Sequence, residues 1–162
     1  MRLRRITVLL LLLVVVFGAV AFAQGIPKLE LKVSEEKMNM SQAEKMGRQE
    51  IAYKPGDVIK YTLWAQNVGT GVMTEPVITN PIPDNVVYKA NSAKGRQTKI
   101  VFSIDGGKTY QSWPPQYKVK DKNGKTVVKA ATPEMITHVQ WQLARSLNPK
   151  ESKKLEFEVT VK

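Results

Sequence analysis

The chain contains no cysteine and only one histidine, His138, among its 162 residues. Without cysteine there is no disulfide framework, no thiolate metal site and no lipid-carrying cysteine after a leader. Acyl transfer needs a nucleophile and usually a positioned base, yet His138 falls on the polar face of an expected strand. A glycine-rich phosphate loop is also missing. We therefore expect a non-enzyme with no catalytic residues, no metal and no cofactor.

Long hydrophobic runs are absent except near the N-terminus. "MRLRR" is followed by an almost unbroken apolar run, and "AFAQG" then presents the small residues Ala21 and Ala23. This layout is typical of a secretory signal peptide that is cleaved after Ala23. We expect residues 1–23 to be the signal peptide and 24–162 the mature domain, located in the periplasm, at the cell surface or outside the cell. The alternative is an uncleaved leader, which would be the chain's only membrane contact.

From Tyr53 onward, polar and apolar residues alternate in short runs. The runs are "DVIKYTLWAQN", "KIVFSID", "HVQWQLA" and "KLEFEVTVK", with turn residues between them. A period of two indicates strands with one buried face. Asn123 and Gly124 predict a two-residue hairpin loop between "YKVKDK" and "KTVVKA". With an early strand at 28–34, about seven or eight short strands predict an all-β fold, a single immunoglobulin-like antiparallel β-sandwich.

Residues 35–50, "EEKMNMSQAEKMGRQE", interrupt this pattern because they are polar and rich in helix formers. We expect a surface loop or short helix that covers a sheet edge, and Trp64 is a candidate for what it covers. The three methionines, Met38, Met40 and Met46, would alternatively contact a partner or donate thioethers to copper(I). Methionine ligation usually comes with histidine or cysteine nearby, and this segment has neither.

Residues 53–162 resemble the conserved-repeat domain of bacterial and archaeal surface proteins, the eleventh of the domains of unknown function. The matching positions are Pro55, Gly56, Asp57, Tyr61, Thr62, Asn67, Gly69, Pro83, Trp141, Leu147, Pro149 and Glu151. The sequence departs from the family at Asn80, where aspartate is frequent, and at Lys150, where glycine is usual. The resemblance implies an exported immunoglobulin-like module of envelope and surface proteins, without a defined enzymatic activity.

Turn residues at the corners of the expected strands are assigned structural roles. They are Pro55, Gly56, Asp57, Asn67, Gly69, Asp105, Gly107, Asn123 and Gly124. "SIDGGKTY", residues 103–110, fits the Asp-box pattern that recurs in sialidase propellers. It occurs once here, so we interpret it as a hairpin turn in which Asp105 binds backbone N–H groups. A carbohydrate-active enzyme is the less favoured alternative.

Acidic residues are scarce between Lys89 and Lys129, where ten basic residues accompany only Asp105 and Asp121. In an exported protein this cluster favours acidic polysaccharide or lipopolysaccharide over nucleic acid. The favoured interpretation of the cluster is nevertheless a solvated lysine face that only keeps the protein soluble, with anionic-glycan binding as the alternative. The candidate contact residues are Trp64, Trp113, Tyr117, Lys118, Lys120 and Lys122.

The leading functional hypothesis is an envelope or extracellular module that acts by protein–protein or structural contact. Its partners would be other envelope or surface proteins or copies of itself, docked at sheet edges where an added strand completes the ladder. In one version, Gln24 to Ser34 pairs with a neighbouring subunit and builds a filament. The alternative is a module that binds anionic glycan through residues 89–129.

Overall fold

The computed structural model describes residues 25–162, so the predicted signal peptide lies outside the described residues. The strands are β1 (Leu29–Lys37), β2 (Val58–Asn67), β3 (Val77–Pro81), β4 (Val86–Tyr88), β5 (Lys94–Gly95), β6 (Thr98–Ser103), β7 (Gln116–Lys120), β8 (Thr126–Ala130), β9 (His138–Leu143) and β10 (Ser152–Val161). The helices are short: α1 (Gln42–Lys45) and a 3-10 turn, η1 (Pro133–Met135). Within the described residues, no helix combines the length and the apolar character that crossing a membrane requires.

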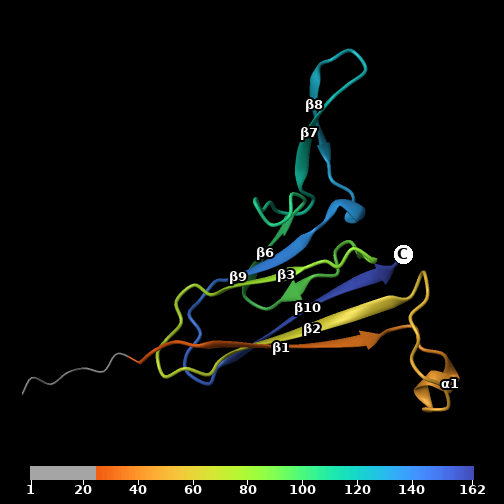
Figure 1. Cartoon of the computed structure of the whole chain (residues 1–162). Coiled ribbons are helices and arrows are strands. Elements are labelled where there is room, and N and C mark those ends of the chain that lie inside the picture. The colour runs from red at the N-terminus through yellow and green to blue at the C-terminus, as the bar shows by residue number, and fades with distance from the viewer. Residues whose placement is uncertain (1–24) are drawn as a thin grey trace, which may run out of the picture.

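Two antiparallel sheets pack face to face (Figure 1). One has the strand order β1-β2-β10-β4, with β5 also paired to β10, and the other has the order β3-β9-β6. The all-β antiparallel sandwich expected from the alternating pattern is therefore confirmed. Its four principal strands facing three match the distribution in immunoglobulin constant-type domains. The final strand, β10, lies in the interior of its sheet, between β2 and β4.

The core lies between β2 and β10 on one side and β9 on the other. Leu63 faces Leu155 across the β2–β10 ladder, and neither side chain is exposed. Trp141 of β9 is also fully buried and packs on Phe157 of β10, with ring centroids 5.9 Å apart. These are the apolar faces that the alternation in residues 57–67, 138–144 and 154–162 predicted.

The first strand is longer than the sequence pattern indicated. It continues to Lys37 instead of ending at Ser34, because residues 35–37 still pair with Tyr61, Lys60 and Ile59 of β2. The polar excursion therefore begins at Met38, and it contains the single-turn helix α1 beyond the ends of β1 and β2 (Figure 1).

β7 and β8 pair with each other and form a hairpin that stands off the sandwich (Figure 1). Its loop has three residues, 122–124, and not the two expected from Asn123-Gly124. Asp121 N donates to Lys125 O at 2.9 Å, and Asp121 Oδ1 accepts from the backbone N of Asn123 and Lys125 at 2.8 and 2.9 Å. Gly124, with φ of 77°, takes the left-handed position that ends a three-residue hairpin loop.

Candidate docking site: the edge of β1 and the Trp64 face

β1 is the terminal strand of its sheet, and no other strand of residues 25–162 pairs with its outer edge. Val68 N donates to Lys28 O and Met38 N donates to Val58 O, each at 2.8 Å, so the even-numbered residues of β1 bond to β2. Along an antiparallel strand, the N–H and C=O groups of successive residues point alternately to one side and to the other. Leu29, Leu31 and Val33 therefore point their N–H and C=O groups away from β2. A further strand would find there a row of ready donors and acceptors.

The inner face of the same strand carries an uncovered apolar row. Leu31 and Val33 pair with Ala65 and Leu63 of β2 and so point to the same side of the sheet. The β2 residues are completely buried, whereas Leu31 is 40% and Val33 51% exposed. The three-stranded sheet thus covers β2 but leaves β1 uncovered. Leu29, at 36% exposure, extends this row along the strand.

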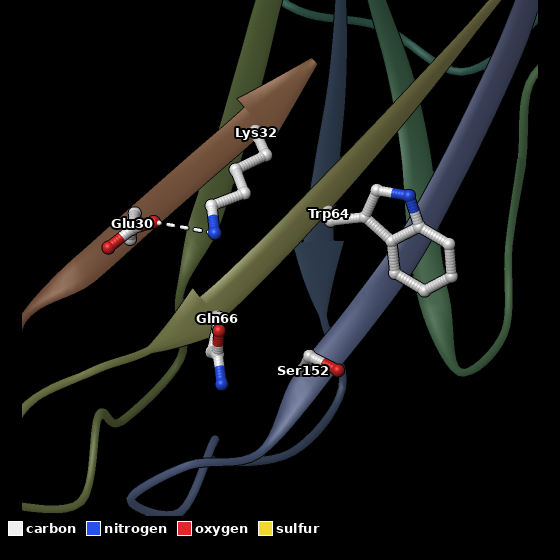
Figure 2. A pocket seen from close by; sticks show the side chains of 5 residues that line it. All are labelled: Glu30, Lys32, Trp64, Gln66 and Ser152. Atoms are coloured by element: carbon white, nitrogen blue, oxygen red, sulfur yellow. Dashed lines mark ion pairs between the residues drawn. The ribbon is translucent and has the colours of Figure 1, made fainter. Parts of the chain in front are cut away.

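The outer face of the sheet holds a shallow hollow of about 210 Å³ beside this edge (Figure 2). Its lining comes from β1, β2 and β10 and consists of Glu30, Lys32, Trp64, Gln66 and Ser152. Glu30 and Lys32, both on β1, form an ion pair at 3.2 Å (Figure 2). The residues are polar and mixed in charge, apart from Trp64, so the hollow offers an aromatic surface with hydrogen-bonding groups around it.

Trp64 is the exposed aromatic of this face. Its side chain is turned toward β10 (Figure 2), where Lys154 Nζ lies 5.7 Å from the ring centroid. Lys154 also contacts Glu156 Oε1 at 2.8 Å, and Lys60 reaches the same oxygen at 2.7 Å, so this shielded carboxylate oxygen is held between two ammonium groups. The pKa of Glu156 is lowered, chiefly by its hydrogen bond from Lys154. Trp64 is 44% exposed, and the 35–50 excursion does not cover it.

A buried ion cluster anchors the other end of β1. Lys37 Nζ lies 2.9 Å from both Glu44 Oε1 and Asp57 Oδ2 and donates to the carbonyl of Ala52 at 2.7 Å. Asp57 Oδ2 also accepts from Lys54 N at 2.8 Å, within the turn where Pro55 precedes Gly56 at φ of 88°. The cluster therefore joins β1, α1 and the start of β2.

Sequence reasoning did not find this cluster, although the sequence contains a signal for it. Lys37 stands at an inward position in the alternation that runs through Leu29, Leu31 and Val33. A lysine on the inner face of a strand requires a buried anionic partner. Glu44 is brought to it by α1, whose Ser41 caps the helix in a capping box with that same glutamate.

We predict that this cluster makes stability depend on acid pH. Hydrogen bonding to Lys37 lowers the pKa of Glu44 from its ordinary value near 4.5 to about 2. Because the folded-state pKa is the lower one, the contribution is complete above about pH 4.5 and is lost as the pH falls toward 2. The melting temperatures of wild type and Glu44→Gln should differ most near neutral pH and converge at low pH. Glu50→Gln, at an exposed position, is the matched control, and a constant gap across the range would contradict the prediction.

Asn67, Gly69 and Gly71 fix the position of residues 25–28, the segment that leads into β1. Asn67 is fully buried; its Oδ1 accepts from Lys28 N at 3.2 Å and from Gly69 N at 3.1 Å. A Cβ on Gly69 would lie 2.2 Å from Ile26 O, and one on Gly71 would lie 1.9 Å from Gly25 O. These glycines are required because the incoming backbone lies directly against them. The corner therefore fixes where β1 begins.

The predicted contact residues of the basic region divide between two places. Lys118, Lys120 and Lys122 are exposed on the β7–β8 hairpin, and Tyr117 is half-buried there. The structure places Trp113 differently: its ring packs edge-on against Tyr88 and Phe102, with centroids 5.6 and 5.3 Å away. Trp113 therefore closes the margin of the core and does not join the lysines or Trp64 in one surface.

The Asp-box segment forms a self-contained turn. Asp105 Oδ1 accepts from Ser103 Oγ at 2.7 Å and from Thr109 N at 2.9 Å, and Asp105 Oδ2 accepts from the Thr109 hydroxyl. The hydroxyl of Thr109 first, and then the other two donors, lower the pKa of this carboxyl well below the ordinary range. Gly107, with φ of 84°, donates its N–H to Ser103 Oγ at 2.9 Å. Phe102 and Gln111 pair across the base of the turn. The oxygens of Asp105 are thus used to hold the loop.

Residues 25–162 contain no group of three or more histidine, aspartate and glutamate side chains placed to hold a metal ion. His138, the single histidine, has its Nδ1 3.1 Å from Thr137 Oγ1 at the side of the sandwich. Three of the described features are open to a partner: the β1 edge, the Trp64 face and the lysine-bearing β7–β8 hairpin.

Comparison with known proteins finds no family model, no curated protein and no solved structure that matches the chain. The resemblance to the conserved-repeat family accordingly stays a prediction from sequence. By fold, the chain is an antiparallel β-sandwich with an open, apolar edge strand.

Proposed function

We propose that this protein is an exported, non-enzymatic module that acts by contact with another protein, and that its docking site is the outer edge of β1. The observation that carries the proposal is the combination of outward-pointing backbone groups and uncovered side chains at Leu29, Leu31 and Val33. An added strand would complete the ladder and bury the apolar row in one step. On this reading the module acts in the cell envelope or at the cell surface, as the leader and the family resemblance suggest.

A second candidate function is binding of anionic polysaccharide or lipopolysaccharide by the β7–β8 hairpin. It is favoured by the exposed Lys118, Lys120 and Lys122 on an element that stands clear of the sandwich (Figure 1). Such contacts are electrostatic and weaken as ionic strength rises. The β1 edge is preferred because it combines unpaired backbone N–H and C=O groups with exposed apolar side chains. Exposed lysines, by contrast, are common on soluble proteins.

The test is the native mass of the mature protein in gentle extracts of the producing cell. Leu31→Lys should convert the assembly to a monomer, because a charge in the apolar row of an edge strand opposes pairing. Leu31 is 40% exposed, so the substitution should leave the sandwich folded. The matched control is the charge-reversed hairpin, Lys118→Glu with Lys120→Glu. If the hairpin variant dissociates and Leu31→Lys does not, the second function replaces the first; a monomeric wild type contradicts docking at β1.

A further inference from the structure

We infer that the occupant of the β1 edge is the β1 strand of a second copy of this chain, paired antiparallel about a two-fold axis at Leu31. This inference rests on the docking function proposed above and adds to it the partner and the register. The outward-pointing backbone groups of β1 and the order of charges along it select both the partner and the register.

The direction of the backbone N–H and C=O groups limits the registers in which two β1 strands can pair. Only the odd-numbered residues of β1 direct their N–H and C=O groups to the open edge, so odd must face odd across a new ladder. With two identical strands, the two-fold axis lies midway between them. It is then level with one residue that faces its own copy, and not with a peptide bond between two residues. Centring it on Leu31 makes Leu31 face its own copy and places Leu29 opposite Val33.

Charge selects among the remaining registers. With the axis at Leu31, Glu30 of each copy stands directly opposite Lys32 of the other, on the outer face of the sheet. Moving the axis to residue 30 puts Glu30 against Glu30, and moving it to residue 32 puts Lys32 against Lys32. An axis at residue 33 sets Glu30 against Glu36. Opposite charges stabilise a cross-strand pair and like charges destabilise it, so the register centred on Leu31 is favoured over these three. An axis at residue 29 also pairs Glu30 with a lysine, Lys28, but it sets Leu31 against Pro27, which has no N–H to donate to the ladder. An axis at residue 34 pairs Lys32 with Glu36, but it sets Val33 against the charged Glu35 on the inner face.

The side chains on the inner face agree with the same register. Leu29 meets Val33, Leu31 meets Leu31, and Val33 meets Leu29, so every exposed apolar residue of the row gains an apolar neighbour. An axis at residue 32 would instead set Leu29 against Glu35. In the favoured register the ladder spans residues 28–34 and ends before Glu35, whose Oε1 is contacted by Tyr53 Oη at 3.3 Å.

The resulting assembly is a closed dimer. The strand order β4-β10-β2-β1 of one copy continues directly into β1-β2-β10-β4 of the other. Because the interface joins identical edges, it is isologous and does not propagate. This dimer differs from the filament that the sequence alone suggested, because each copy keeps its own β1 paired with β2 and uses only the outer edge for the second copy.

Because the chain contains no cysteine, single-cysteine variants test the register directly. Under mild oxidation, Leu31→Cys should form a disulfide-linked dimer at least about tenfold faster than Ser34→Cys, since the assembly raises the effective concentration of the facing thiols. Glu30→Cys mixed with Lys32→Cys should give the mixed dimer in preference to either symmetric one. Ser34→Cys is the matched control, because it lies on the same strand but faces Lys28 in this register.

A charge exchange provides an independent readout. Lys32→Glu sets glutamates against glutamates and should raise the dimer dissociation constant about tenfold or more. The double variant Glu30→Lys with Lys32→Glu restores opposite pairs and should recover dimerisation. Failure of the double variant to recover would overturn the register.

The outcomes separate this inference from the docking function. Rapid self-linking of Lys32→Cys, or no linking at any position, overturns the register centred on Leu31. If the Leu31 and Val33 amides of the assembled protein are nevertheless protected from hydrogen exchange, the edge binds a different chain, and the docking function stands alone. If those amides exchange freely in the assembly, both the docking function and this inference fail.

Discussion

Replacing Trp141 by alanine should lower the free energy of unfolding by about 3–5 kcal/mol, the usual cost of removing a large buried aromatic side chain. Trp141 is fully buried at the centre of β9 and packs on Phe157 across the sandwich. Its indole Nε1 donates to Lys94 O at 3.1 Å, so the substitution also removes this hydrogen bond. Domains of this size are stable by only about 5–15 kcal/mol. Chemical denaturation should therefore show that the variant retains only a small part of the wild-type free energy of unfolding.

The matched control is Trp64→Ala, since both residues are tryptophans in interior strands of their sheets. Trp64 is 44% exposed on the outer face, so its removal should change the free energy of unfolding by less than about 1 kcal/mol. Trp141→Phe should fall between the two, because it keeps most of the packing and loses the bond to Lys94. Equal losses for Trp141→Ala and Trp64→Ala would contradict the assignment of inner and outer faces.

The sequence was sufficient to predict the sandwich because its central strands alternate strictly. In β9 and in residues 154–161 of β10, each inward position is apolar and each outward position is polar, so period and burial agree without tertiary information. The prediction of loop length was less accurate, because side-chain hydrogen bonds within a loop decide how many residues it contains. Asp121 captures two backbone amides and adds a residue to the hairpin loop, which the Asn-Gly pair alone did not indicate.

The open edge of β1 could not be predicted from sequence in the same way. Leu29, Leu31 and Val33 have the alternation of a half-buried strand, and only the facing sheet determines whether that half is covered. The end of β1 was missed because Glu35, Glu36 and Lys37 are poor strand formers by composition. They stay in the strand because Lys37 is neutralised by Glu44, which lies seven residues further along the chain and is placed by α1.

The departure at Lys150 has a structural consequence. Lys150 has φ of 67°, in the left-handed region that glycine tolerates best, and it stands where the resemblance to the conserved-repeat family leads one to expect glycine. Its N–H donates to Asn67 O at 2.7 Å, so the turn before β10 is held by the same corner that fixes the start of β1. Two segments that are distant in sequence therefore meet at Asn67.

The second large effect is expected at that corner. Asn67 Nδ2 donates to Gly71 O at 2.8 Å and to Leu147 O at 2.9 Å, in addition to the two bonds its Oδ1 accepts. Asn67→Ala removes all four at a site with no exposure, and leaving buried polar groups unpaired should cost about 2–4 kcal/mol in total. Asn80→Ala is the control, because its side chain bonds only to the neighbouring Pro81 O, near the surface.

The Asn67 substitution should also loosen β1 selectively, which links stability to the docking site. Lys28 N bonds to Asn67 Oδ1, and the Ile26 carbonyl accepts from Thr70 N at 3.0 Å, so the corner positions the residues that enter the strand. Hydrogen exchange at Lys28 should accelerate in Asn67→Ala more than exchange at Val139 in the core. Because docking needs β1 held in register with β2, the variant should also dimerise less tightly than Asn80→Ala. Unchanged exchange at Lys28 together with full stability would show that the backbone alone fixes this corner.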